Sequence, residues 1–218
     1  MNTKYFTPIL AIPMLAAALD AQSPKTDALL MAMSANAKQT AAYQWKQRTT
    51  IIRRGNPVGV KIDEVRFDAM GKMQRITLSQ PEEKRMGPLR AKKAAEIKSS
   101  VQDVMALMGR YATPQEIGRA IKKGEVWEGQ GSMRVQAHYI ILPSDEMTLV
   151  ADSRTYLATR VDFKTQYEGS PVAIAIDYQQ MPGGPAVMSR MTVQIPGEDI
   201  VVNVESFDFV RLAAGLVP

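Results

Sequence analysis

The chain has 218 residues, a formal net charge of +5 and no cysteine. Without cysteine it can form no disulfide, and it cannot be anchored through a lipid attached to an N-terminal cysteine. No stretch interleaves basic and aromatic residues, which argues against nucleic acid as a partner.

The first 21 residues have the pattern of a secretory signal peptide. Lys4 precedes a mostly apolar run from Pro8 to Leu19, and small and polar residues follow, with cleavage predicted after Ala21. An ordinary N-terminal helix is the alternative reading, whereas a membrane anchor would need an apolar run of about 20 residues. We therefore expect a signal peptide over residues 1–21 and a single domain over residues 22–218.

The beginning of the predicted domain changes from helical to strand periodicity. Apolar residues at helical spacing, among them Leu30, Met33 and Ala37, predict a helix over Thr26–Ala42. A meander of three strands is predicted next, over Tyr43–Arg54, Val58–Phe67 and Lys72–Gln80. Its turns are the polar, glycine-containing segments Arg54–Pro57 and Asp68–Gly71.

Alternation within the meander assigns faces to its side chains. Trp45, Thr49 and Ile51 share the buried face of the first strand, and Ile76 and Leu78 point inward from the third. In the second strand Val58, Val60 and Ile62 are out of phase with Val65 and Phe67. This phase change predicts a bulge near Asp63–Glu64.

A helical insert follows Pro81. The long helix from Leu89 to Met108 has apolar residues spaced for one face: Ile97, Val101, Val104, Met105 and Met108. A capping box at Thr113–Glu116 then opens a short helix that ends at Gly124, with Ile117 and Ile121 inward.

The rest of the chain is a series of strands separated by short Pro/Gly turns. The predicted strands are Glu125–Gln130, Met133–Leu142, Met147–Ala151, Leu157–Gln166, Val172–Gln179, Val187–Ile195 and Ile200–Phe209. In the fourth of these, the alternation places Leu157, Thr159, Val161, Phe163 and Thr165 on the dry face. Strands joined by such short loops are antiparallel neighbours.

These elements predict an α+β fold. About ten hairpin-linked strands make one large antiparallel sheet that curls into an unclosed half-barrel, because a twisted sheet of that size does not stay flat. About three helices cover its concave face.

The order of these elements resembles the LolA/LolB-like family of periplasmic lipoprotein carriers. The resemblance covers the chain after the signal peptide, and includes Tyr43–Lys46 at the start of the first strand and Met188–Val193 near the end. It implies a periplasmic protein in which an unclosed barrel and a helical lid enclose an apolar cavity for acyl chains. The partner implied is a lipid or an acylated protein.

Two sets of residues are candidates for binding. The apolar set, which lines either a cavity or a packed core, consists of Trp45, Ile97, Val101, Val104, Met105, Met108, Phe163, Ile176 and Met191. The basic set near the long helix consists of Lys84, Arg85, Arg90, Lys92, Lys93 and Lys98. It is either a solvated helix face or a surface that docks on anionic headgroups or an acidic envelope protein.

No catalytic or metal-binding pattern stands out in the sequence. His138 is the only histidine and lies on the polar face of its strand, so neither a catalytic triad nor a zinc site is expected. We expect no enzyme, cofactor or metal. The leading hypothesis is an exported carrier or sensor of an apolar ligand. The alternative is a protein-interaction module of the bacterial envelope, such as a stress regulator or an assembly subunit.

Overall fold

The computed structural model describes residues 24–68, 71–79, 92, 95–96, 99, 101–107 and 114–212. The strands are β1 (Tyr43–Arg53), β2 (Asn56–Phe67), β3 (Met73–Ser79), β4 (Glu125–Gly129), β5 (Ser132–His138), β6 (Glu146–Asp152), β7 (Ala158–Tyr167), β8 (Ser170–Gln180), β9 (Ala186–Ile195) and β10 (Ile200–Arg211). The helices are α1 (Pro24–Thr40), α3 (Pro114–Lys123) and the short 3-10 helix η1 (Pro196–Glu198). Residues 101–107 are helical as well.

All ten strands belong to one antiparallel sheet whose order is β3-β2-β1-β10-β9-β8-β7-β6-β5-β4. The strands β1–β3 and the strands β4–β10 each form a meander, and the two meanders are joined by pairing of the first strand, β1, with the last, β10. This ladder runs from Tyr43 opposite Arg211 to Arg53 opposite Ile200. The expectation that all strands follow one another as hairpins is wrong at this point. β3 and β4 follow each other in the order of described strands, yet they form the two opposite edges of the sheet.

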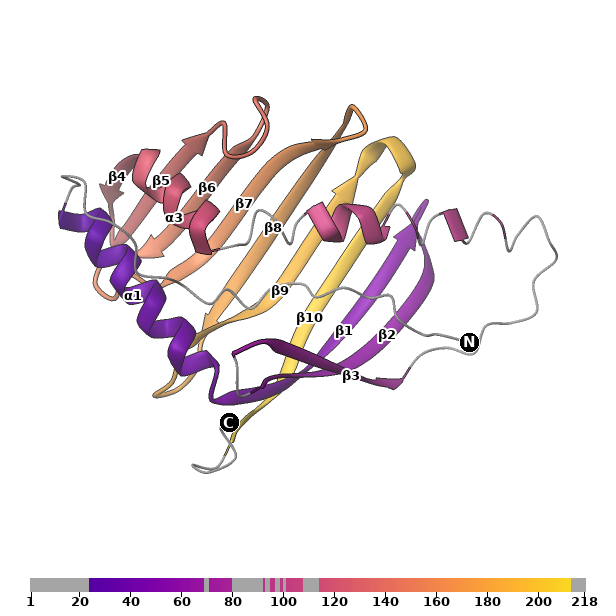
Figure 1. Ribbon diagram of the computed structural model, residues 1–218, viewed down its shortest axis with the longest axis horizontal. Coiled ribbons are helices and arrows are strands. Elements are labelled where there is room, and N and C mark those ends of the chain that lie inside the picture. The colour runs from indigo at the N-terminus through magenta and orange to yellow at the C-terminus, as the bar shows by residue number, and fades with distance from the viewer. Residues whose placement is uncertain are drawn as a thin grey trace.

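The sheet curls, and the helices lie on its concave side. In Figure 1, α1 runs diagonally across one end of the sheet, while residues 101–107 and α3 lie over the same face. In the described part of the chain β3 and β4 do not pair, so the sheet stays open. The predicted α+β half-barrel is confirmed. None of the described helices is long and apolar enough to cross a membrane.

Three of the hairpins share one type of two-residue turn. Arg54–Gly55, Gln130–Gly131 and Glu168–Gly169 each have positive φ at both residues, 50° and 76° in the first case. Two consecutive left-handed residues match the right-handed twist of the flanking strands, and glycine adopts the second conformation without steric cost. These turns fix the register of the ladders that they connect.

One apolar core connects the helices with the concave face. Leu29 of α1, Ile121 of α3, and Val101 and Val104 of the helical residues 101–107 are almost completely buried, in one cluster with inward residues of β1 and of β5 to β10. The inward residues of β5, β6 and β9, such as Met133, Met147 and Met191, are also fully buried. The methionines fill the space between helices and sheet because their flexible side chains adapt to irregular gaps.

Strand β3 faces the opposite way from the expectation. Ile76 and Leu78 are 45% and 49% exposed on the outer face. Arg75, which is half-buried, and Thr77, which is exposed, share the face of the buried Asp63 on β2 instead, because Asp63 needs partners: its Oδ1 accepts a hydrogen bond from Thr77 Oγ1 at 2.9 Å. Lys61 Nζ lies 2.9 Å from the same oxygen. Burial lowers the pKa of Arg75 to about 10, although the charge of Asp63 opposes this shift.

Strand β2 keeps a single phase through the position of the predicted bulge. Asp63, Val65 and Phe67 are buried, while Val58 and Val60 are exposed. The register does shift between Ile62 and Asp63, but in the ladder with β3. The change of phase in the sequence of β2 is only apparent, because inward positions of this strand are polar. The shift in register with β3 does not change which residues of β2 point inward.

The start of β7 contains a bulge that the alternation did not predict. Ala158 is buried and Thr159 is exposed, the reverse of the expectation, whereas Val161, Phe163 and Thr165 are buried as predicted. The ladder with β6 skips Thr159: Val150 lies opposite Arg160, and Ala151 lies opposite Ala158. A bulge inserts one residue and so reverses the faces on one side of it.

Strand β5 ends at His138, four residues before the predicted end. Beyond it Tyr139 has a φ of 55°. The buried carboxylate of Asp145 then accepts hydrogen bonds from the backbone N–H groups of Ile141, at 2.8 Å, and Leu142, at 2.6 Å. The N–H groups that would have extended the ladder are thus bound by a side chain.

Candidate functional site

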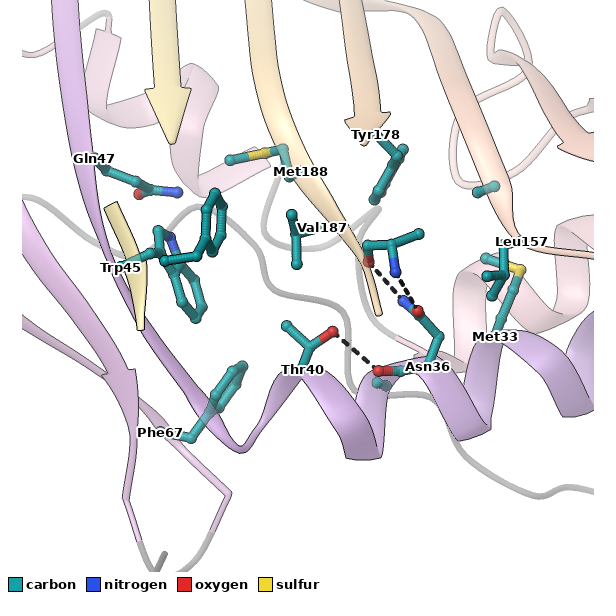
Figure 2. A pocket seen from close by; sticks show the side chains of 14 residues that line it. Met33, Asn36, Thr40, Trp45, Gln47, Phe67, Leu157, Tyr178, Val187 and Met188 are labelled. Carbon is teal, nitrogen blue, oxygen red and sulfur yellow. Dashed lines mark hydrogen bonds between the residues drawn. The ribbon is translucent and has the colours of Figure 1, made fainter. Parts of the chain in front are cut away.

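A pocket of about 60 Å³ lies between the C-terminal half of α1 and the concave face of the sheet. Figure 2 shows α1 along one side, with Met33, Asn36 and Thr40 pointing toward the sheet. The sheet contributes residues from β1, β2, β7, β8, β9 and β10. Most of the lining side chains are apolar, and none of those described carries a charge.

Helix α1 is held over the pocket by hydrogen bonds of one side chain. Asn36 Nδ2 donates to the carbonyl oxygen of Ala186 at 2.8 Å, and the N–H of Ala186 donates to Asn36 Oδ1 at 2.7 Å. Ala186 is the first residue of β9. Both hydrogen-bonding groups of the amide are therefore used to join the helix to the end of a strand, at the edge of the pocket (Figure 2).

Three aromatic rings form the wall of the pocket next to β1. The ring of Trp45 lies 5.9 Å from that of Phe67 and 6.0 Å from that of Phe209, and is nearly parallel to the latter at 24°. Together with Val65 they make a small apolar cluster separate from the main core. Stacked and tilted rings at these distances attract one another, and this attraction stabilises the arrangement of the three side chains.

Two polar side chains interrupt the apolar lining on the side of the sheet. Gln47 of β1 is completely buried, and its Nε2 donates to Ser206 Oγ at 3.2 Å. Within the part of the chain that the structure describes, its Oε1 has no hydrogen-bond partner. The second is Tyr178 of β8, whose phenol has a raised pKa because it is desolvated. Its hydroxyl therefore stays protonated across the physiological range.

The structure places the predicted apolar set in two environments. Trp45 lines the pocket. The remaining described members lie in the packed core between the helices and the sheet, and are buried: Val101, Val104, Met105, Phe163, Ile176 and Met191. Ile97 and Met108 lie outside the described residues. A ligand-lining role for the core members stays a prediction.

Of the predicted basic set, the structure describes one member. Lys92 is exposed. The other members, Lys84, Arg85, Arg90, Lys93 and Lys98, lie outside the described residues. Their proposed contact with anionic headgroups or an acidic protein also stays a prediction.

His138 is exposed on the outer face of β5, where the sequence places it, and its ring nitrogen lies 3.3 Å from Gln136 Nε2. Among the residues that the structure describes, no group of three or more His, Cys, Asp or Glu side chains is arranged to hold a metal ion.

Most of the pocket is not apparent from the sequence. The helical spacing places Met33 and Ala37 only in the apolar stripe of the first helix, and Asn36 beside them shows no signal of its own. Gln47 does show one: it is in phase with Trp45 and Thr49, so a polar residue occupies a position on the buried face. Such a position is expected to have a special partner, because buried polar groups in proteins are almost always hydrogen-bonded.

The sequence matches no protein-family model and no curated protein. Solved structures with a similar chain path exist at low sequence identity. A LolA superfamily protein from Nitrosomonas europaea is 10% identical, with a TM-score of 0.39 over 88% of this chain and 95% of that one. A DUF1329 family protein from Desulfovibrio piger is 11% identical, with a TM-score of 0.41 over the same shares, 88% and 95%.

A third similar structure is a putative outer membrane lipoprotein-sorting protein domain from Vibrio parahaemolyticus. It is 11% identical, with a TM-score of 0.39 over 80% of this chain and 86% of that one.

Proposed function

We propose that this chain is an exported, non-enzymatic binding protein that holds an apolar chain between α1 and the concave face of the sheet. The observation that carries the proposal is the pocket beneath α1, which has apolar and aromatic walls and no charged lining residue among those described. A mostly apolar concave site with a few polar groups is the usual form of a site for a small apolar molecule. The signal-peptide pattern of residues 1–21 supports a periplasmic location.

The size of the pocket implies that α1 moves when a ligand enters. The volume is about 60 Å³, whereas a cavity of about 150 Å³ is known to hold benzene. An acyl chain therefore needs the C-terminal half of α1 to shift away from the sheet. We propose that this half of α1 acts as the lid.

The energies of opening and of binding are comparable. Opening breaks the two hydrogen bonds between Asn36 and Ala186, at a cost of about 1 kcal/mol each. Each methylene buried by the ligand contributes about 0.8 kcal/mol. About three buried methylenes would offset the lost hydrogen bonds, so a chain of moderate length is sufficient to keep the lid open.

A pair of alanine-to-tryptophan variants of α1 tests the proposal. Ala37 lines the pocket, and Ala35, two residues earlier, is exposed. Binding of the apolar dye Nile red would be followed by its fluorescence. Ala37→Trp is expected to fill the pocket and to reduce dye affinity at least tenfold, while Ala35→Trp binds like the wild type. Wild-type protein that does not bind the dye, or equal binding by all three proteins, would reject the proposal.

A second candidate function, a protein-interaction module, is favoured by one other observation. Val58 and Val60 of β2 and Ile76 and Leu78 of β3 are exposed on the outer face at one edge of the sheet. Apolar residues gathered in this way often mark a protein contact. This candidate predicts an envelope protein that co-purifies with the wild type and is lost from the double variant Ile76→Lys/Leu78→Lys but retained by Ala37→Trp.

A further inference from the structure

The amide oxygen of Gln47 is a hydrogen-bond acceptor that no described residue uses. Gln47 is 0% exposed, lies opposite Ser206 in the ladder of β1 with β10, and lines the pocket. Its amide nitrogen donates to Ser206, whereas Oε1 has no hydrogen-bond partner among the described residues. A buried acceptor without a partner destabilises the protein, and such groups are rare in native structures. A ligand that supplied a donor would remove this cost.

The lining also restricts the charge of that ligand group. No described side chain around the pocket is charged. A carboxylate, phosphate or ammonium that entered it would lose its hydration without gaining a counter-charge. The group that reaches Gln47 is therefore neutral.

We infer that the natural ligand is a neutral amphiphile whose hydroxyl or amide N–H group donates a hydrogen bond to Oε1 of Gln47, while its hydrocarbon chain occupies the apolar part of the pocket. The class includes long-chain alcohols, the hydroxyl of a partly acylated glycerol and the amide of an N-acyl group. This inference rests on the proposed function, since it assigns the ligand of the same pocket.

Two isomeric ligands test the inference: 1-decanol, which has a donor, and methyl nonyl ether, which has none. Their affinities would be measured by displacement of Nile red from the wild type, from Gln47→Met, and from Gln44→Met. The last variant is the matched control, because Gln44 is on the same strand but does not line the pocket. For each protein, the affinity for the alcohol is divided by the affinity for the ether. The two ligands differ in hydration, but this difference is the same for every protein, so it cancels when the ratios are compared.

The ratio is expected to fall roughly tenfold from the wild type to Gln47→Met, which is the effect of one hydrogen bond to a buried acceptor, and to stay unchanged in Gln44→Met. An equal ratio in wild type and Gln47→Met would overturn the inference but leave the proposed function standing. A ratio that rises in Gln47→Met would also overturn it, because the amide would then be presenting its NH₂ group to the ether oxygen. If Nile red does not bind to the wild type, the proposed function fails and the inference fails with it.

Discussion

The side-chain amide of Asn36 forms a matched pair of hydrogen bonds with the backbone of Ala186, at 2.8 and 2.7 Å. The two residues are 150 positions apart in the sequence. This pairing attaches the C-terminal half of α1 to the first residue of β9, beside the pocket. It is the polar contact that a movement of α1 away from β9 has to break.

Asn36→Ala is expected to loosen α1 without unfolding the sheet. Loss of both hydrogen bonds deprives the N–H and carbonyl of the buried Ala186 of these partners, so the free energy of unfolding should fall by about 1–3 kcal/mol. Nile red should bind faster, because less energy is needed to lift the helix. Thermal melts and stopped-flow fluorescence measure the two effects. The control is Lys38→Ala on the exposed side of α1; equal binding rates in both variants would show that α1 is not the lid.

The apolar stripe of the helical residues 101–107 is expected to be essential for stability. Val101 and Met105 are 1% and 5% exposed. Replacing both with Asp would bury unpaired charges, at a cost of several kcal/mol, which is comparable to the whole stability of a domain. We expect the double variant Val101→Asp/Met105→Asp to be largely unfolded by circular dichroism. A melt like that of the wild type would show that this helix does not pack on the sheet.

The basic set gives the complementary prediction. Lys92 is exposed, and Lys92→Ala/Lys93→Ala should change the free energy of unfolding by less than ~0.5 kcal/mol. If the basic set docks on anionic headgroups, the same variant should bind vesicles of anionic lipid more weakly than the wild type. Unchanged vesicle binding would show that the basic set is only a solvated face.

Tyr167 is expected to make stability depend on alkaline pH. Its hydroxyl donates to Asp103 Oδ2 at 3.1 Å, joining β7 to the helical residues 101–107. Desolvation raises the pKa of Tyr167 from 10.0 to about 12, with further contributions from the hydrogen bond to Asp103 and from nearby carboxylates. Because the pKa in the folded protein is the higher one, the stabilising contribution is fully present below pH 10 and is lost as the pH rises through about 12.

Melting temperatures of the wild type and Tyr167→Phe between pH 8 and pH 12 measure this effect. The wild type should be the more stable protein at the lower end, and the difference should disappear toward the upper end. The comparison cancels the titration of lysines, which both proteins share. A constant difference across the range would contradict the assignment of the shift to Tyr167.

The architecture was predictable from the sequence because most strands have one apolar face. Val161, Phe163, Val172 and Ile174 show this, since alternation alone identifies their buried sides. The prediction of which face is buried fails where the buried residues are polar. At β3 the faces are decided by the buried Asp63, which takes Thr77 and Arg75 as partners on its own face, and Ile76 and Leu78 are consequently left on the opposite, outer face.

The site was less predictable than the fold because its residues are brought together by long-range pairing. Trp45 and Phe209 meet only because β1 pairs with β10, and this pairing has no local signal in either strand. Asn36 acts on Ala186 through a distant contact of the same kind. Sequence spacing describes individual strands and helices well, but it does not give the order of strands in a sheet whose first and last strands, β1 and β10, pair in its middle.

The most direct test of the central claim is to map where a ligand touches the protein. A ten-carbon alcohol with a photoreactive diazirine at the end of its chain would be cross-linked to the protein, and the labelled peptides identified by mass spectrometry. We expect labels in α1, between Met33 and Thr40, and at the start of β9, and we expect Ala37→Trp to lose them while Ala35→Trp keeps them. Labels confined to the outer face of β2 and β3, around Val60, Ile76 and Leu78, and unchanged by Ala37→Trp, would contradict the claim that the chain binds its ligand beneath α1.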